Sequence, residues 1–172
     1  MVGLVAADPN RLTPESKDLR LLALAVIGLV GAVNTVSLGL LVHRLIYGRF
    51  SDGPMLLGSA AGVWLTNTVV FALLYWELDR GGPLGRVGAR AAPTHPDLLF
   101  PQDTSPKVAS PGWRPAYVDY LFVSLTSSTA FSPTDTMPLT RRAKGLMGLQ
   151  ALVSLLTVAL VAARAVNVLK GG

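Results

Sequence analysis

Three long uncharged runs dominate the pattern of hydrophobic and polar positions along the chain. They cover residues 21–42, 54–76 and 145–163, and none of them contains Asp, Glu, Lys or Arg. A helix rises about 1.5 Å per residue, so about 20 apolar residues cross a hydrocarbon core about 30 Å thick. The pattern therefore predicts an all-α membrane protein with three transmembrane helices, which form a single transmembrane domain over residues 1–172.

Local signals indicate where these helices begin and end. Pro14 suits the first position of a helix, which we expect over residues 14–47. A turn and then an aromatic–charged boundary predict the second helix over residues 54–78, and the last apolar run predicts a helix over residues 139–170. The segment 79–115 is rich in Pro, Gly and Arg, so we expect an extramembrane loop with little regular structure.

A fourth apolar run is too short to cross a membrane as a helix. Residues 120–134 carry no charge, but this is well below the length that a span needs. Pro133 excludes a continuous helix through the end of the run. Non-helical backbone at membrane depth is tolerated only where protein buries it or where it lines a wet cavity. The sequence therefore predicts a short re-entrant helix and a filter-like segment over residues 116–137.

Polar side chains also lie inside the predicted spans. Gln150, Ser154 and Thr157 follow one stripe of the last helix, at spacings of four and three. Such a stripe either lines a pore or packs against a neighbouring helix through hydrogen bonds, and both interpretations stay open. Asn34 and Asn67 are expected to hydrogen-bond to neighbouring helices.

Charged residues mark the boundary between the second helix and the loop. Glu77 and Asp79 follow the aromatic end of that helix. They either pair with Arg141 or Arg142 across the loop or remain solvated at the membrane interface.

Composition narrows the class of protein further. Charged residues make up 15% of the chain, against about 25% in soluble domains. The net charge is +5, but the basic residues lie in loops and at helix ends, so we expect a lipid bilayer and not nucleic acid as the partner. No nucleophile–base pair, metal-ligand spacing or phosphate loop is visible, which predicts no enzyme and no cofactor. The excess of Arg over Lys is typical of GC-rich bacteria and favours a multi-pass protein of the bacterial cytoplasmic membrane.

The segment 124–138 reads S-L-T-S-S-T-A-F-S-P-T-D-T-M-P. It resembles the pore loop of tetrameric cation channels, whose potassium-selective members read roughly S-F-T-T-L-T-T-V-G-Y-G-D-x-x-P. Five positions match in place: Ser124, Thr126, Thr129, Asp135 and Pro138. The resemblance covers residues 119–167. It implies a helix–pore loop–helix hairpin, a homotetramer and passage of monovalent cations.

The filter-like segment departs from the potassium pattern. It comprises Thr129, Ala130, Phe131, Ser132, Pro133, Thr134 and Asp135. A potassium filter aims successive backbone carbonyls at the ion, which needs conformations that glycine adopts freely. Ser132 and Thr134 occupy the two glycine positions, so we expect no potassium-type filter. The hydroxyls of Thr129, Ser132 and Thr134 could instead form a wider polar ring that passes hydrated cations.

Two questions stay open at this stage. Asp135 is either a carboxylate at the mouth of the pore or a cap of the turn after Pro133. The whole chain is either channel-like or a non-conducting structural or partner-binding membrane protein that keeps the hairpin as architecture. A channel orientation places most Lys and Arg outside, whereas the positive-inside rule favours the reverse.

A wider resemblance covers nearly the whole chain. Residues 76–83 (W-E-L-D-R-G-G-P), 100–102 (F-P-Q) and 129–135 (T-A-F-S-P-T-D) are similar to those of a family of uncharacterised bacterial multi-helix membrane proteins. Members often carry one more helix at the amino end, and residues 1–7 look like the tail of such a helix. The resemblance implies that the chain begins late, and it implies no established activity.

Overall fold

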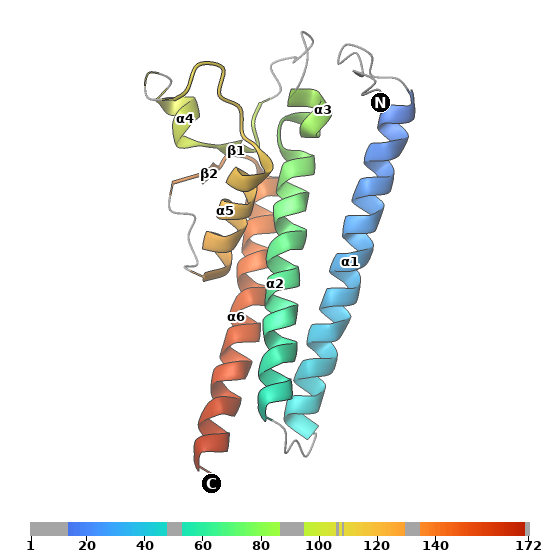
Figure 1. Ribbon diagram of the computed structural model, residues 1–172, viewed down its shortest axis with the longest axis vertical. Coiled ribbons are helices and arrows are strands. Elements are labelled where there is room, and N and C mark those ends of the chain that lie inside the picture. The colour runs from blue at the N-terminus through green and yellow to red at the C-terminus, as the bar shows by residue number, and fades with distance from the viewer. Residues whose placement is uncertain are drawn as a thin grey trace, which may run out of the picture.

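The computed structural model describes residues 14–47, 53–86, 95–105, 107, 109–129 and 135–170. Three long helices dominate it: α1 (Pro14–Tyr47), α2 (Gly53–Leu78) and α6 (Arg141–Lys170) (Figure 1). Each contains a stretch long and apolar enough to cross a membrane. The prediction of a helical protein with three helices of spanning length is confirmed, and the helix ends lie within two residues of the expected positions.

Helix α2 stands between α1 and α6, and each neighbouring pair is antiparallel (Figure 1). A Cβ atom added at Gly31 would lie 3.3 Å from the side chain of Val70, so a small residue permits the close approach of α1 to α2. The amide of Asn34 donates a 3.2 Å hydrogen bond to the carbonyl of Val63, as the sequence predicted for an asparagine inside a span.

The short apolar run forms α5 (Tyr117–Thr129), which packs against α2 and α6 along one half of their length (Figure 1). Its buried face consists of Tyr120, Val123, Ser124, Ser127 and Ser128. Three of these five residues are serines, so the contact with the long helices is largely polar.

Segment 79–115 has more regular structure than expected. A 3₁₀ turn (Asp79–Gly81) leads into α3 (Gly82–Arg86), and β1 (Leu98–Leu99) is followed by α4 (Pro101–Thr104). Strand β1 pairs antiparallel with β2 (Met137–Pro138), with Leu98 opposite Pro138. The expectation of little regular structure is therefore wrong for residues 79–86 and 95–105, which contain a 3₁₀ turn, two short helices and a strand that pairs with β2.

The main hydrophobic core lies where this folded segment meets the helices. Phe100 stacks edge-on against Tyr120, with ring centroids 5.4 Å apart, and against Trp113 at 5.9 Å. The remaining members are Phe71, Tyr75, Leu98, Val123, Ala143 and Met147. The segment thus covers one end of the α2–α5–α6 bundle as a packed cap, which we define as residues 79–86 and 95–105.

Candidate functional site

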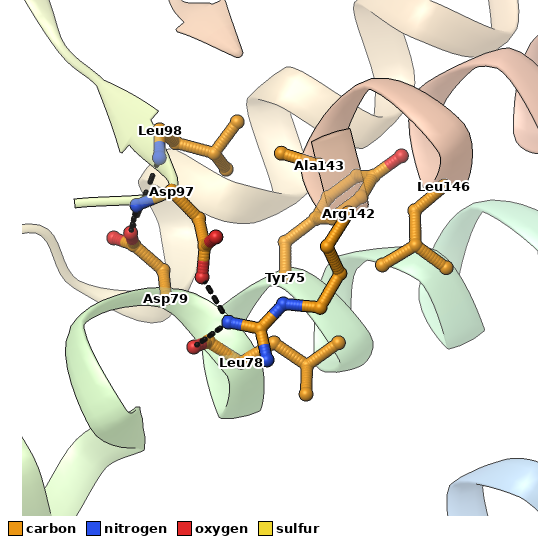
Figure 2. Close-up of a pocket in the computed structure, with 8 residues that line it drawn as sticks. All are labelled: Tyr75, Leu78, Asp79, Asp97, Leu98, Arg142, Ala143 and Leu146. Carbon is orange, nitrogen blue, oxygen red and sulfur yellow. Dashed lines mark hydrogen bonds and ion pairs between the residues drawn. The ribbon is translucent and has the colours of Figure 1, made fainter. Parts of the chain in front are cut away.

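Asp79, the first residue of the 3₁₀ turn after α2, is the centre of a buried polar cluster. The residue is 1% exposed, and a buried carboxylate needs hydrogen-bond partners. It accepts bonds from the backbone N–H groups of Asp97 at 2.7 Å and Leu98 at 3.2 Å (Figure 2). The hydroxyl of Tyr120 donates a third bond at 2.7 Å. Asp79 therefore joins the cap, α2 and the first turns of α5.

The Nε atom of Arg80 lies 3.2 Å from the Asp79 carboxylate and forms an ion pair with it, and two further ion pairs hold the cap beside this carboxylate. Arg80 pairs with Asp103 through two contacts, of which Nη1 to Oδ1 measures 3.0 Å; such two-point pairs fix orientation as well as distance. Arg142 of α6 pairs with Asp97 and donates a 3.3 Å bond to the carbonyl of Leu78 (Figure 2). Of these two further pairs, the first anchors α4 to the turn after α2, and the second anchors the segment before β1 to α6.

Arg86 closes the cluster from α3. Its Nη1 atom donates 2.9 Å bonds to the carbonyls of Trp76 and Asp79, and its guanidinium lies 5.1 Å from the ring centroid of Tyr120. Burial lowers the pKa of Arg86. Burial raises the pKa of Tyr120, and the hydrogen bond to Asp79 raises it further, so the phenol stays a neutral donor.

The two pairings proposed for Glu77 and Asp79 across the loop are wrong, and so is their solvation at the interface. Asp79 binds Tyr120 and the cap, as described above, and Glu77 is buried at 6% exposure. The guanidinium of Arg20 donates a 2.9 Å bond to the Glu77 carbonyl and lies 3.9 Å from its carboxylate. The folded cap covers both carboxylates. The cap was not expected from the sequence, so the burial of the two carboxylates was not predicted.

A cavity of about 10 Å³ remains inside the cluster, between Tyr75, Asp97, Arg142 and their neighbours (Figure 2). It has room for about one water molecule, so it is too small for an organic ligand. Within the described ranges, no three His, Asp or Glu side chains gather as metal ligands. The charged groups here bind one another and hold the cap in place.

Gln150 is the centre of a second polar network, deeper in the bundle. It is fully buried, accepts a 2.5 Å bond from the Tyr75 hydroxyl and donates 2.8 Å bonds to the Ser124 carbonyl and the Ser128 hydroxyl. The Ser124 hydroxyl in turn donates a 2.6 Å bond to the carbonyl of Thr68. One amide side chain therefore links α2, α5 and α6.

The rest of the polar stripe on α6 also faces inward. The Asn67 amide donates a 3.1 Å bond to the Ser154 hydroxyl, which confirms the expected interhelical bond for this asparagine. Thr157 is 2% exposed and bonds to the carbonyl of Val153, one turn earlier on its own helix. The structure thus places Gln150, Ser154 and Thr157 together on the buried side of α6.

Most of the filter-like segment lies outside the described residues, namely Ala130, Phe131, Ser132, Pro133 and Thr134. Thr129 ends α5, is exposed, and bonds to the carbonyl of Leu125 at 3.0 Å. Asp135 is exposed and stands two residues before β2.

Sequence reasoning missed the roles of Asp97 and Asp103. Each lies in a polar segment without periodicity, and its partner arginine is 45 or 23 positions away. One local signal existed at Phe100-Pro101-Gln102-Asp103, because proline at the first turn with an acid at the third position is typical of a helix start.

Comparison of the chain with models of protein families, with curated proteins and with solved structures finds no match. The functional proposal therefore rests on the fold and on the polar networks around Asp79 and Gln150.

Proposed function

We propose that the protein is a channel-like integral membrane protein in which α5 and the segment after it form a re-entrant hairpin. The observation that carries this proposal is the depth that α5 reaches. Near its end, Ser128 bonds to Thr68 at 3.2 Å, and Thr68 lies ten residues before the end of α2 at Leu78. That is about 15 Å along the helix, about half of a 30 Å hydrocarbon core.

The two flanks of the hairpin lie at one end of the bundle. Tyr117 begins α5 against Trp76, with ring centroids 5.9 Å apart. After α5, the chain reaches β2, which pairs with β1 of the cap. A segment that starts near Trp76, reaches the level of Thr68 and comes back to the cap has the path of a pore loop.

A neighbouring subunit would complete the pore. Val118, Phe122 and Leu125 are exposed on α5, at 66%, 53% and 42%, and with Thr129 they form one stripe along the helix. In a homotetramer this stripe would face the next copy of the chain. With Ser132 and Thr134 at the positions of the filter glycines, the proposed pore is wide and passes hydrated monovalent cations without potassium selectivity.

Flux measurements on purified protein in liposomes test the proposal. We expect K⁺ and Na⁺ flux of similar size, reduced severalfold by Asp135→Asn, which removes the carboxylate at the proposed mouth. The matched control is Asp18→Asn, an exposed acid on α1, which should leave the flux unchanged. Absence of cation flux in folded, oligomeric protein would contradict the proposal.

A second candidate is a non-conducting membrane protein that keeps the hairpin as architecture. The specific observation in its favour is that the polar groups of Gln150 and Ser154 are used inside one chain. This leaves that stripe no role at a pore surface. A stable monomer in mild detergent, measured by light scattering coupled to gel filtration, would favour this candidate over the first.

A further inference from the structure

A groove runs between α1 and α2, away from α5 and the cap. It has two adjoining parts, of about 390 and 310 Å³, each within the range of about 300–1,000 Å³ that is common for ligand sites. Thr66 lines both parts, so the two hollows adjoin at this residue.

The two parts differ in chemistry. The first is lined by hydroxyl, amide and guanidinium groups of Ser37, Ser59, Asn34 and Arg44, together with aliphatic carbon. The second part is aliphatic apart from Thr66: Val26, Ile27, Val30, Leu65, Val69, Val70 and Leu73. The groove is therefore amphipathic along its length.

The geometry of α1 sets the size of each part. Arg44 and Asn34 are ten residues apart, about 15 Å along the helix, and Val26 lies about 12 Å beyond Asn34. The polar part thus spans about half of a hydrocarbon core and the apolar part most of the other half. Both parts lie within stretches that are apolar enough to cross a membrane, so the groove opens toward lipid.

Among the described residues, Arg44 is the one charged residue that lines either part, and none of the described lining residues is acidic. Three of the other polar groups already have partners in the protein: the Asn34 amide donates to the carbonyl of Val63, and both serines donate to backbone carbonyls. Ser37 and Ser59 donate to the carbonyls of Val33 and Met55 at 2.9 and 2.8 Å. Their oxygens keep acceptor capacity, whereas the guanidinium of Arg44 brings a full positive charge to the end of the groove.

We propose that this groove binds an anionic phospholipid. The phosphate lies at Arg44, the polar linkage region contacts Ser37 and Ser59, and one acyl chain follows the aliphatic part past Val69. A guanidinium matches phosphate geometry with two parallel N–H groups. The aliphatic wall packs against the acyl chain of the lipid. The site does not depend on whether the protein conducts ions.

The role of the Arg44 charge is tested by measuring which lipids stay bound to the purified protein. Native mass spectrometry in mild detergent would compare phosphatidylglycerol with phosphatidylcholine. We expect the wild type to retain phosphatidylglycerol in preference to phosphatidylcholine, whose choline cation offsets the phosphate charge. Arg44→Gln should reduce retention of phosphatidylglycerol about tenfold, which is typical for the loss of a charge-assisted hydrogen bond, and retention of phosphatidylcholine by less, so that the preference is lost. The control is Lys144→Gln, an exposed base at the other end of the bundle, which should retain the wild-type preference.

A matched glycine pair tests the groove itself. Gly62 lines the polar part, and an added Cβ atom there meets nothing within 4 Å. Gly58 is equally open but does not line either part. Gly62→Leu should therefore fold and lower retention of both lipids, whereas Gly58→Leu should not. An unchanged lipid preference in Arg44→Gln would overturn the proposal, and so would a Gly62→Leu variant that alters oligomeric state while keeping its lipid.

Discussion

The carboxylate of Asp79 and the hydroxyl of Tyr120 are 41 positions apart in the sequence and share a 2.7 Å hydrogen bond. Asp79 begins the 3₁₀ turn directly after α2, a helix of spanning length, and Tyr120 lies in the first turns of α5. The bond therefore fixes the height at which α5 starts, and the remaining contacts of α5 determine how far down α2 it reaches. This bond ties the proposed pore loop directly to the cap.

Tyr120→Phe removes that hydroxyl and leaves a buried carboxylate with one partner fewer. We expect the free energy of unfolding to fall by about 1–3 kcal/mol, the usual cost of a lost bond to a buried charged group. The measurement is thermal or SDS-induced unfolding of the protein in mild detergent.

Tyr117→Phe is the matched control, because it makes the same chemical change one turn earlier on α5. Tyr117 is half-buried, and its hydroxyl has no hydrogen-bond partner within the described part of the chain. This variant should unfold within about 0.5 kcal/mol of the wild type. Equal losses in the two variants would show that the phenol of Tyr120 contributes packing and no anchoring bond.

Two adjacent glycines in the turn after α2 offer a test of backbone geometry. Both have positive φ, +77° at Gly81 and +84° at Gly82. Gly82 combines this φ with a ψ of −176°, a region that is essentially restricted to glycine. A Cβ atom there would also lie 2.8 Å from the carbonyl oxygen of Glu77, whereas at Gly81 it meets nothing within 4 Å.

Gly81→Ala should therefore cost about 1–2 kcal/mol for the left-handed backbone alone. Gly82→Ala should cost more, because strain and a backbone clash act together. Equal unfolding free energies for the two alanine variants, measured in the same detergent, would contradict the close approach of this turn to Glu77.

Periodicity and length predicted the long helices because those signals are local. The uncharged runs reach the span length by themselves, and Pro14 marks the start of α1. The same reasoning identified Gln150, Ser154 and Thr157 as one stripe. It left their role open, because the choice between a pore and a helix contact depends on which face α2 and α5 cover.

The cap could not be predicted in the same way. Asp97 pairs with Arg142 across 45 positions, and neither residue lies in a pattern that distinguishes it from solvated charges. Asp79 follows aromatic residues at a helix end, where a solvated interfacial charge is the ordinary expectation. The burial of Asp79 depends on the segment at β1, whose backbone N–H groups at Asp97 and Leu98 donate hydrogen bonds to it.

Gln150→Leu tests whether the deep network holds α5 against the long helices. The substitution keeps the volume and removes the bonds to Tyr75, Ser124 and Ser128. Interhelical bonds in membranes average about 0.6 kcal/mol and reach about 1.7. We therefore expect a loss of about 1–3 kcal/mol in the free energy of unfolding, measured by SDS titration.

Leu152→Ala on the same helix provides the comparison. Leu152 is 54% exposed and lies two residues from Gln150 on the outer side of α6. Its truncation should change stability by less than about 0.5 kcal/mol. If both variants are as stable as the wild type, the network around Gln150 contributes nothing to the docking of α5.

Cysteine labelling tests the path of the chain between α5 and α6 directly. The protein contains no cysteine, so each introduced thiol reports one position without background. Val118→Cys and Met137→Cys stand on the two flanks of the proposed hairpin and are 66% and 63% exposed. In sealed vesicles treated with a membrane-impermeant maleimide, we expect both to react from the same face.

Two positions on α1 calibrate the measurement. Asp18→Cys and Tyr47→Cys lie near opposite ends of a helix of spanning length, so they should react from opposite faces. The start of α1, which contains Asp18, lies at the end of the bundle that carries the cap (Figure 1), so the Asp18→Cys variant should match Val118→Cys and Met137→Cys. If Val118→Cys and Met137→Cys instead react from opposite faces, the segment between them crosses the bilayer. A pore loop is then excluded, because a chain that leaves on the far side cannot line a filter from within one leaflet.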